Sequence, residues 1–108
     1  MIQFQYFEGC PNSKQTLAHL YAVQKELGID EQDIEIVEVP DADSSERLQF
    51  QGSPTILVDG VDIYTGLKPT DNSYTCRVYI FEGKRTGVIP IEFIREKFRA
   101  WMEASSKK

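Results

Sequence analysis

Hydrophobic and polar residues alternate in several short stretches of the chain. Near its start, Ile2, Phe4 and Tyr6 are separated by glutamines, and this period of two, rich in aromatic residues, is typical of a β-strand. Asp59 and Gly60 separate two β-prone runs, and this dipeptide predicts a tight hairpin between them. Strands are expected at residues 2–7, 34–39, 55–58, 61–64 and 76–81.

A spacing of three or four residues between apolar positions predicts the helices. Leu20 and Val23 fall on one helical face, and Gly28 supplies a C-terminal stop. The same spacing runs from Ile91 to Trp101, on a face that suits core packing and would also suit a weak homodimer. Helices are expected at residues 12–27, 41–50 and 90–104, followed by a polar tail at 105–108.

The order of these elements predicts one α/β domain over residues 1–104, which is close to the commonest domain size. The early strand–helix–strand unit implies a parallel pair of strands with a right-handed crossover. The hairpin then adds antiparallel strands. We therefore expect a central mixed sheet of four to five strands that is flanked by helices.

Composition narrows the classes of function. The chain has 12 Lys and Arg against 17 Asp and Glu, a net charge of −5, and no basic tract, which argues against nucleic-acid partners. Its apolar runs are far shorter than the ~20 residues that span a bilayer, so no membrane partner is expected. One histidine and two distant cysteines give no zinc spacing, and we expect no metal and no other cofactor.

The cysteine content and the first residues predict the compartment. The start of the chain lacks the basic and apolar regions of a signal peptide. Two cysteines in such a chain indicate reactive thiols in the reducing cytoplasm rather than a disulfide framework.

The junction between the first strand and the first helix is where chemistry is expected. A helix N-terminus presents unpaired N–H groups and the positive end of a dipole, so a thiolate at Cys10 would be stabilised there. Proline is favoured in the first turn of a helix, where Pro11 would lie, and Asn12 is a small polar residue that also suits this turn. Ser13 is expected to donate a hydrogen bond to the Cys10 sulfur. The competing interpretation of Cys10 is a buried structural thiol.

Cys76 begins a β-prone run, and its place relative to Cys10 stays open. It is either a buried core residue or a second thiol that loop 65–75 brings beside Cys10. A rival arrangement pairs 76–81 directly with the third strand, which would leave Cys76 at the far end of the sheet. A loop of this length reaches in many directions, so its reach alone does not decide between them. Because no other resolving thiol is present, we predict that Cys76 lies on the Cys10 side of the molecule and can bond with Cys10 under oxidation.

Two motifs point to a known superfamily. Cys10 and Ser13 form a CxxS motif after the first strand, and Ser53-Pro54-Thr55 opens the third strand ahead of the Asp-Gly hairpin. With these motifs the chain resembles the thioredoxin-like superfamily in a glutaredoxin-like arrangement, and it is similar to a group of uncharacterised bacterial thioredoxin-like proteins. The resemblance implies a thioredoxin-like fold with Cys10 as the nucleophile and Pro54 as a cis-proline beside it. It also implies substrate contacts from Pro11, Asn12, Ser53 and Pro54.

The motif departs from the family because Ser13 stands where a second cysteine is usual. What remains is a one-thiol site, or a pair that Cys10 makes with Cys76. The preferred function is a thiol-disulfide oxidoreductase or redox-responsive protein that acts on a disulfide or a small thiol such as glutathione. The alternatives are an organomercurial-lyase-like thiol enzyme, which needs an acid that meets both sulfurs, and a binding module that has lost turnover and is a monomer or weak homodimer.

Charged residues near the motif are expected to be solvated. Glu8 is interpreted as a strand-end charge, and His19 lies too far along the helix to act as a base for Cys10. Lys68 and Arg77 belong in or beside a solvated loop, although they would also suit an anionic thiol such as glutathione.

Overall fold

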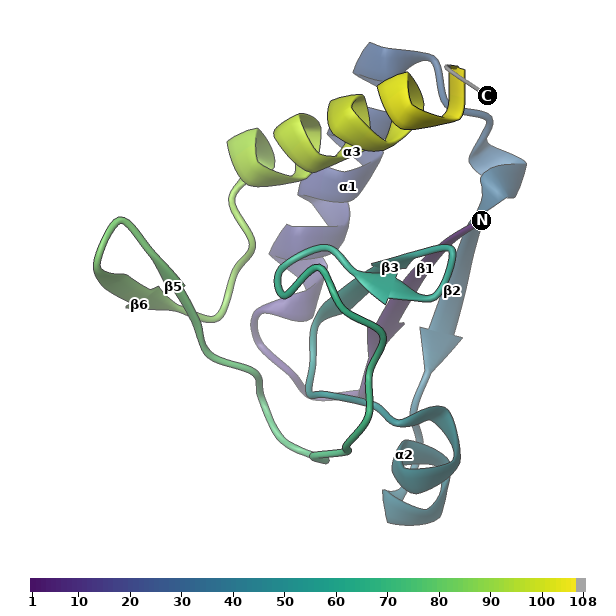
Figure 1. Cartoon of the computed structure of the whole chain (residues 1–108). Helices are drawn as coiled ribbons and strands as arrows, with labels where there is room; N and C mark the ends of the chain where they lie inside the picture. Colours follow the sequence, from purple (N-terminus) through teal and green to yellow (C-terminus); the bar gives the residue numbers. More distant parts are fainter. Residues whose placement is uncertain (107–108) are drawn as a thin grey trace.

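The computed structural model describes residues 1–106 and shows a mixed α/β fold around one four-stranded sheet (Figure 1). The strands lie in the order β2-β1-β3-β4, and a separate two-stranded sheet is formed by β5 and β6. The elements are β1 (Ile2–Tyr6), α1 (Ser13–Leu27), the 3-10 turn η1 (Glu31–Asp33), β2 (Ile34–Glu38), α2 (Ala42–Leu48), β3 (Thr55–Val58), β4 (Val61–Asp62), β5 (Tyr79–Phe81), β6 (Lys84–Thr86) and α3 (Ile91–Ser106).

The predicted strand directions are confirmed. β1 pairs with β2 in parallel and with β3 in the antiparallel sense, so Phe4 lies between Ile36 and Ile56. β3 turns through Asp59 and Gly60 into β4, its antiparallel partner. The α/β class with a central mixed sheet of four strands and flanking helices is therefore as expected.

The core lies between the sheet and two helices. Figure 1 shows α3 crossing α1 on one side of the sheet, whereas α2 lies away from both. Leu20 and Val23 of α1 and Phe98 of α3 are completely buried, as is Phe4 of β1. Burial of each large apolar side chain contributes roughly 1.5–3 kcal/mol, which explains why the helical spacing of these residues fixes the faces that meet.

The segment from Cys76 onward departs from the prediction. Residues 76–81 were expected to form one strand among the four to five of the central sheet. Only Tyr79–Phe81 is a strand, and it pairs with β6 outside that sheet. The rival pairing of this segment with the third strand is wrong because β4 occupies that edge. β4 itself is shorter than the predicted 61–64, since the Gly66 N–H donates to the Asp62 carbonyl and turns the chain.

The C-terminal helix is longer than its pattern predicts. α3 continues to Ser106, so the first two positions of the predicted polar tail are helical, and residues 107–108 lie outside the described residues. Among the helices in the described part of the chain, none is long and apolar enough to cross a membrane.

Candidate active site

Cys10 lies in the sharp turn that joins β1 to α1. Gly9 has a φ of 91°, a left-handed conformation that favours glycine, and the Cys10 N–H then donates to the Phe7 carbonyl. The helix begins just after this turn, with Asn12 as its N-terminal cap residue. Cys10 is only 6% exposed, so its thiol is held inside the turn rather than displayed on the surface.

The start of β3 lies against the Cys10 thiol. The Ser53–Pro54 peptide bond is cis, as the resemblance implied. The Ser53 carbonyl lies 3.5 Å from the Cys10 sulfur, where it accepts the thiol proton when Cys10 is protonated. The Ser53 hydroxyl oxygen accepts from the Phe7 N–H at 3.3 Å. β1 and β3 are hydrogen-bonded neighbours, so the end of one and the start of the other meet at this point.

Cys76 lies beside Cys10 and is not a core residue. Its side chain is exposed, and its sulfur lies 3.8 Å from the Cys10 sulfur. Two backbone hydrogen bonds hold the Cys76 segment against Ser53: the Ser53 N–H donates to the Thr75 carbonyl at 2.9 Å, and the Arg77 N–H donates to the Ser53 carbonyl at 2.8 Å. The loop therefore brings together two thiols that are 66 residues apart.

The two thiols have opposite pKa shifts. Burial raises the pKa of Cys10, but hydrogen bonds donated to its sulfur outweigh burial and leave the pKa below its usual range. Burial also raises the pKa of Cys76, and the neighbouring Cys10 sulfur raises it further. The donors that lower the pKa of Cys10 are, in order of effect, the Ser53 side chain, the Asn12 backbone, the Cys76 thiol and the Ser13 backbone.

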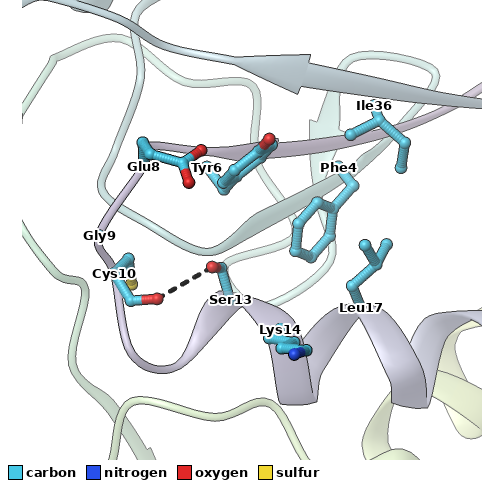
Figure 2. Close-up of a pocket in the computed structure, with 9 residues that line it drawn as sticks. All are labelled: Phe4, Tyr6, Glu8, Gly9, Cys10, Ser13, Lys14, Leu17 and Ile36. Atoms are coloured by element: carbon cyan, nitrogen blue, oxygen red, sulfur yellow. Dashed lines mark hydrogen bonds between the residues drawn. The ribbon is translucent and has the colours of Figure 1, made fainter.

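The predicted hydrogen bond from the Ser13 side chain to the sulfur is not made. The Ser13 hydroxyl donates instead to the Cys10 carbonyl at 3.0 Å (Figure 2). This carbonyl lies in a buried turn ahead of the helix, where an unpaired acceptor would cost free energy. Ser13 lowers the pKa of Cys10 through its backbone N–H, as expected at a helix N-terminus.

The predicted substrate-contact residues differ in exposure. Pro11 is exposed and Asn12 is half-buried, whereas Ser53 and Pro54 are buried. The Asn12 side chain packs so closely on Gly87 that a Cβ there would lie 2.0 Å from its Nδ2 atom. Both backbone groups of Ser53 are already paired within the chain, so a substrate would reach Ser53 only by displacing residues 75–77.

A groove of about 330 Å³ opens beside the Cys10 turn (Figure 2). Its walls are largely apolar and are formed by Phe4, Tyr6 and Ile36 of the sheet with Leu17 of α1. The sulfur contacts of Cys10 involve Ser53 and Cys76, which do not line this groove. Cys10 itself lines the groove together with Ser13, so the groove reaches Cys10 but not Cys76.

Arg77 was expected to be solvated, and this was wrong. Its guanidinium donates to the Asp62 carboxylate at 2.5 Å and to the Thr55 hydroxyl at 3.1 Å. This buried ion pair removes Arg77 from the anion-binding role that the sequence left open, while Lys68 is exposed. The sequence carries little signal for the pair, because Asp62 follows a hairpin and reads as a surface charge.

The remaining polar residues behave as predicted. Glu8 is exposed, and the half-buried His19 places its Nδ1 atom 2.9 Å from the Ile89 carbonyl, away from Cys10.

Within the described residues, the side-chain hydrogen bonds of the two sulfurs involve Ser53 and each other, and none involves a carboxylate. No group of three or more His, Cys, Asp or Glu in this part of the chain is arranged to hold a metal ion.

Comparison with protein-family models, with curated proteins and with solved structures gave no match for this chain. Support for a function therefore comes from the geometry of the two thiols and the cis peptide bond.

Proposed function

We propose that the chain is a thiol-disulfide oxidoreductase of the thioredoxin-like superfamily that uses Cys10 and Cys76 as its redox pair. The observation that carries the proposal is the 3.8 Å separation of the two sulfurs. The strand order β2-β1-β3-β4, the cis peptide bond before Pro54 and the start of α1 next to Cys10 support the superfamily.

The first step of the proposed reaction is attack by the Cys10 thiolate on a substrate disulfide. One new bond joins the Cys10 sulfur to the first substrate sulfur, and the substrate S–S bond breaks. The second substrate sulfur leaves as a thiolate and takes a proton from solvent. The lowered pKa of Cys10 favours this role, because the thiolate is the attacking species.

The second step releases the substrate. Cys76 loses its proton to solvent and attacks the Cys10 sulfur, which forms the Cys10–Cys76 disulfide and expels the remaining substrate thiolate. The raised pKa of Cys76 falls at this stage, because Cys10 in a mixed disulfide has lost the charge that opposes ionisation of Cys76. The substrate disulfide is thus reduced to two thiols while the protein dithiol is oxidised.

In the proposed pair, Cys76 takes the role of the second cysteine of a CxxC motif, because this chain has Ser13 at that position. An external thiol or dithiol returns the protein to its reduced form by the reverse exchange. We place the chain in the cytoplasm, where the dithiol is the resting state. Substrates of the proposed enzyme are disulfides or small thiols such as glutathione, and a protein with the same pair but slow turnover would act as a redox sensor.

Peptide mapping without reductant tests the pair. The reduced protein is treated with a mild excess of glutathione disulfide, quenched with acid and digested, and the Cys10 and Cys76 peptides are identified by mass. We expect the two peptides joined, and in Cys76→Ser we expect Cys10 to accumulate as the mixed disulfide with glutathione. A wild-type protein in which Cys10 carries glutathione or a sulfenic acid while Cys76 stays free would show a one-thiol site.

A further inference from the structure

Cys76 lies in a long connection that has little regular structure. Residues 63–78 link β4 to β5 without a helix or strand, and Cys76 is exposed at their far end. Unlike the exposed Cys76, the next residue is largely buried: the Arg77 side chain is only 10% exposed, and the side chain of its partner Asp62 is 1% exposed. An arginine buried one residue from a reactive thiol restricts where that thiol can be.

The Arg77 guanidinium is held by two strands of the main sheet and by two tyrosine rings from outside that sheet. Its Nη2 atom bonds Asp62 of β4, and its Nη1 atom bonds Thr55 of β3. The rings of Tyr64 and Tyr79 lie 5.5 and 4.6 Å from the guanidinium carbon, at distances typical of cation–π contacts. These contacts fix the connection to the sheet directly downstream of Cys76.

The same residues brace the backbone around the cis peptide bond. The Arg77 N–H donates to the Ser53 carbonyl, and the Tyr79 hydroxyl donates to the Pro54 carbonyl. The two segments approach so closely that a Cβ at Gly52 would lie 2.9 Å from the Arg77 Cβ. Gly52 also has a φ of 118°, a conformation that L side chains rarely adopt.

Upstream of Cys76 the connection has a second attachment. The Tyr74 hydroxyl donates to the Val39 carbonyl at 3.0 Å, and the Tyr74 ring packs against Phe7. Cys76 is therefore held between an aromatic contact on one side and the Arg77 ion pair on the other.

We propose that the Arg77–Asp62 pair is a positioning device that sets the effective concentration of Cys76 at the Cys10 sulfur. The proposal rests on the redox pair proposed above and adds the residues that control its equilibrium. A second thiol on a loosely held connection spends much of its time away from its partner, which weakens an intramolecular bond. Anchoring the adjacent residue removes that freedom before the disulfide forms.

The chemistry of arginine suits this role better than that of lysine. The planar guanidinium bonds two acceptors on different strands while it stacks on two aromatic rings. A lysine ammonium is a single point charge on a flexible stem, so Arg77→Lys keeps the charge and loses part of the anchoring.

The equilibrium between the reduced and disulfide forms in glutathione buffers tests the proposal. We expect Arg77→Met to lower the effective concentration of the pair by about tenfold or more, which corresponds to a rise of ~30 mV in reduction potential for each tenfold loss. Arg77→Lys should give a smaller loss in the same direction. Arg95→Met is the matched control, because Arg95 pairs with Glu26 at 2.6 Å between α3 and α1 and does not contact the cysteines.

A second measurement separates positioning from general damage. In a Cys76→Ala background, which has no donor at position 76, Arg77→Met should leave the alkylation rate of Cys10 unchanged, because the anchor acts through the side chain at that position. An Arg77→Met protein that is folded by circular dichroism and keeps the wild-type potential would overturn the inference while leaving the proposed function intact. Should Arg77→Met fail to fold, Arg77→Lys decides in the same way. A wild-type protein that forms no Cys10–Cys76 disulfide in any buffer overturns the proposed function itself.

Discussion

At Cys10 two physical effects oppose each other. Burial raises the pKa of the thiol, because removing solvent disfavours the charged form. Donors aimed at the sulfur favour the thiolate, and together they outweigh burial. Two of these donors are backbone N–H groups, of Asn12 and Ser13, that any chain would provide at a helix start. The Ser53 side chain and the Cys76 thiol are specific to this sequence.

Removing the donor at Cys76 should raise the pKa of Cys10. We expect wild-type Cys10 to be alkylated by iodoacetamide with a pH midpoint below that of an ordinary cysteine thiol, because hydrogen bonds to its sulfur lower its pKa. Cys76→Ala loses a donor that lowers this pKa, so its midpoint should move up and its rate at neutral pH should fall. Cys76→Ser keeps a hydroxyl donor and should stay closer to wild type. Equal midpoints in all three proteins would show that the sulfurs do not interact.

Ser13→Ala should affect stability rather than reactivity. The substitution leaves the backbone N–H near the sulfur and removes the hydroxyl that satisfies the Cys10 carbonyl. We expect a loss of about 1 kcal/mol in the free energy of unfolding, the usual cost of an unpaired buried acceptor. Urea denaturation measures this loss, and Ser13→Thr, which retains a hydroxyl, is the control. A large shift of the alkylation midpoint in Ser13→Ala would instead mean that the hydroxyl reaches the thiolate.

At the scale of elements, local signals predict the central sheet and the long helices well. Gly28 ends α1 in a left-handed conformation, and the Asp59-Gly60 turn leads β3 into β4, as the residue types indicate. The β5–β6 hairpin was not predicted as a separate sheet. Its strands are short, and β propensity alone cannot state which partner a strand will pair with. Pairing here depends on β4, which already occupies the edge of the central sheet.

At the scale of the whole molecule, the site depends on contacts between residues far apart in the chain. Sequence motifs located Cys10 and the Ser53–Pro54 bond, because both sit at ends of predictable elements. The place of Cys76 beside Cys10 was predicted only from the absence of another resolving thiol, and the structure confirms it. The geometry of the connection could not be predicted, since a long connection reaches in many directions at little entropic cost. The Arg77–Asp62 pair and the two bonds to the Ser53 backbone decide its place, and each needs the folded sheet to bring its partners together.

Oxidation should therefore stabilise the whole fold. A bond between Cys10 and Cys76 closes a loop of 66 residues, and restricting the unfolded chain to that extent is worth about 4 kcal/mol. We expect urea denaturation of the oxidised protein to give a free energy of unfolding higher by this amount than that of the reduced protein. Cys76→Ser exposed to the same oxidant should show no gain.

Folding should also stabilise the disulfide, by the same free energy that the disulfide contributes to the fold. If the disulfide stabilises the fold by about 4 kcal/mol, the fold stabilises the disulfide equally, which is about a thousandfold in its equilibrium with a thiol buffer. The bond should thus resist reductant concentrations in native protein that break it in urea-unfolded protein. A gain close to zero would contradict the prediction, because it would mean that the native protein must distort to close the bond and that the observed thiol contact does not represent a redox pair.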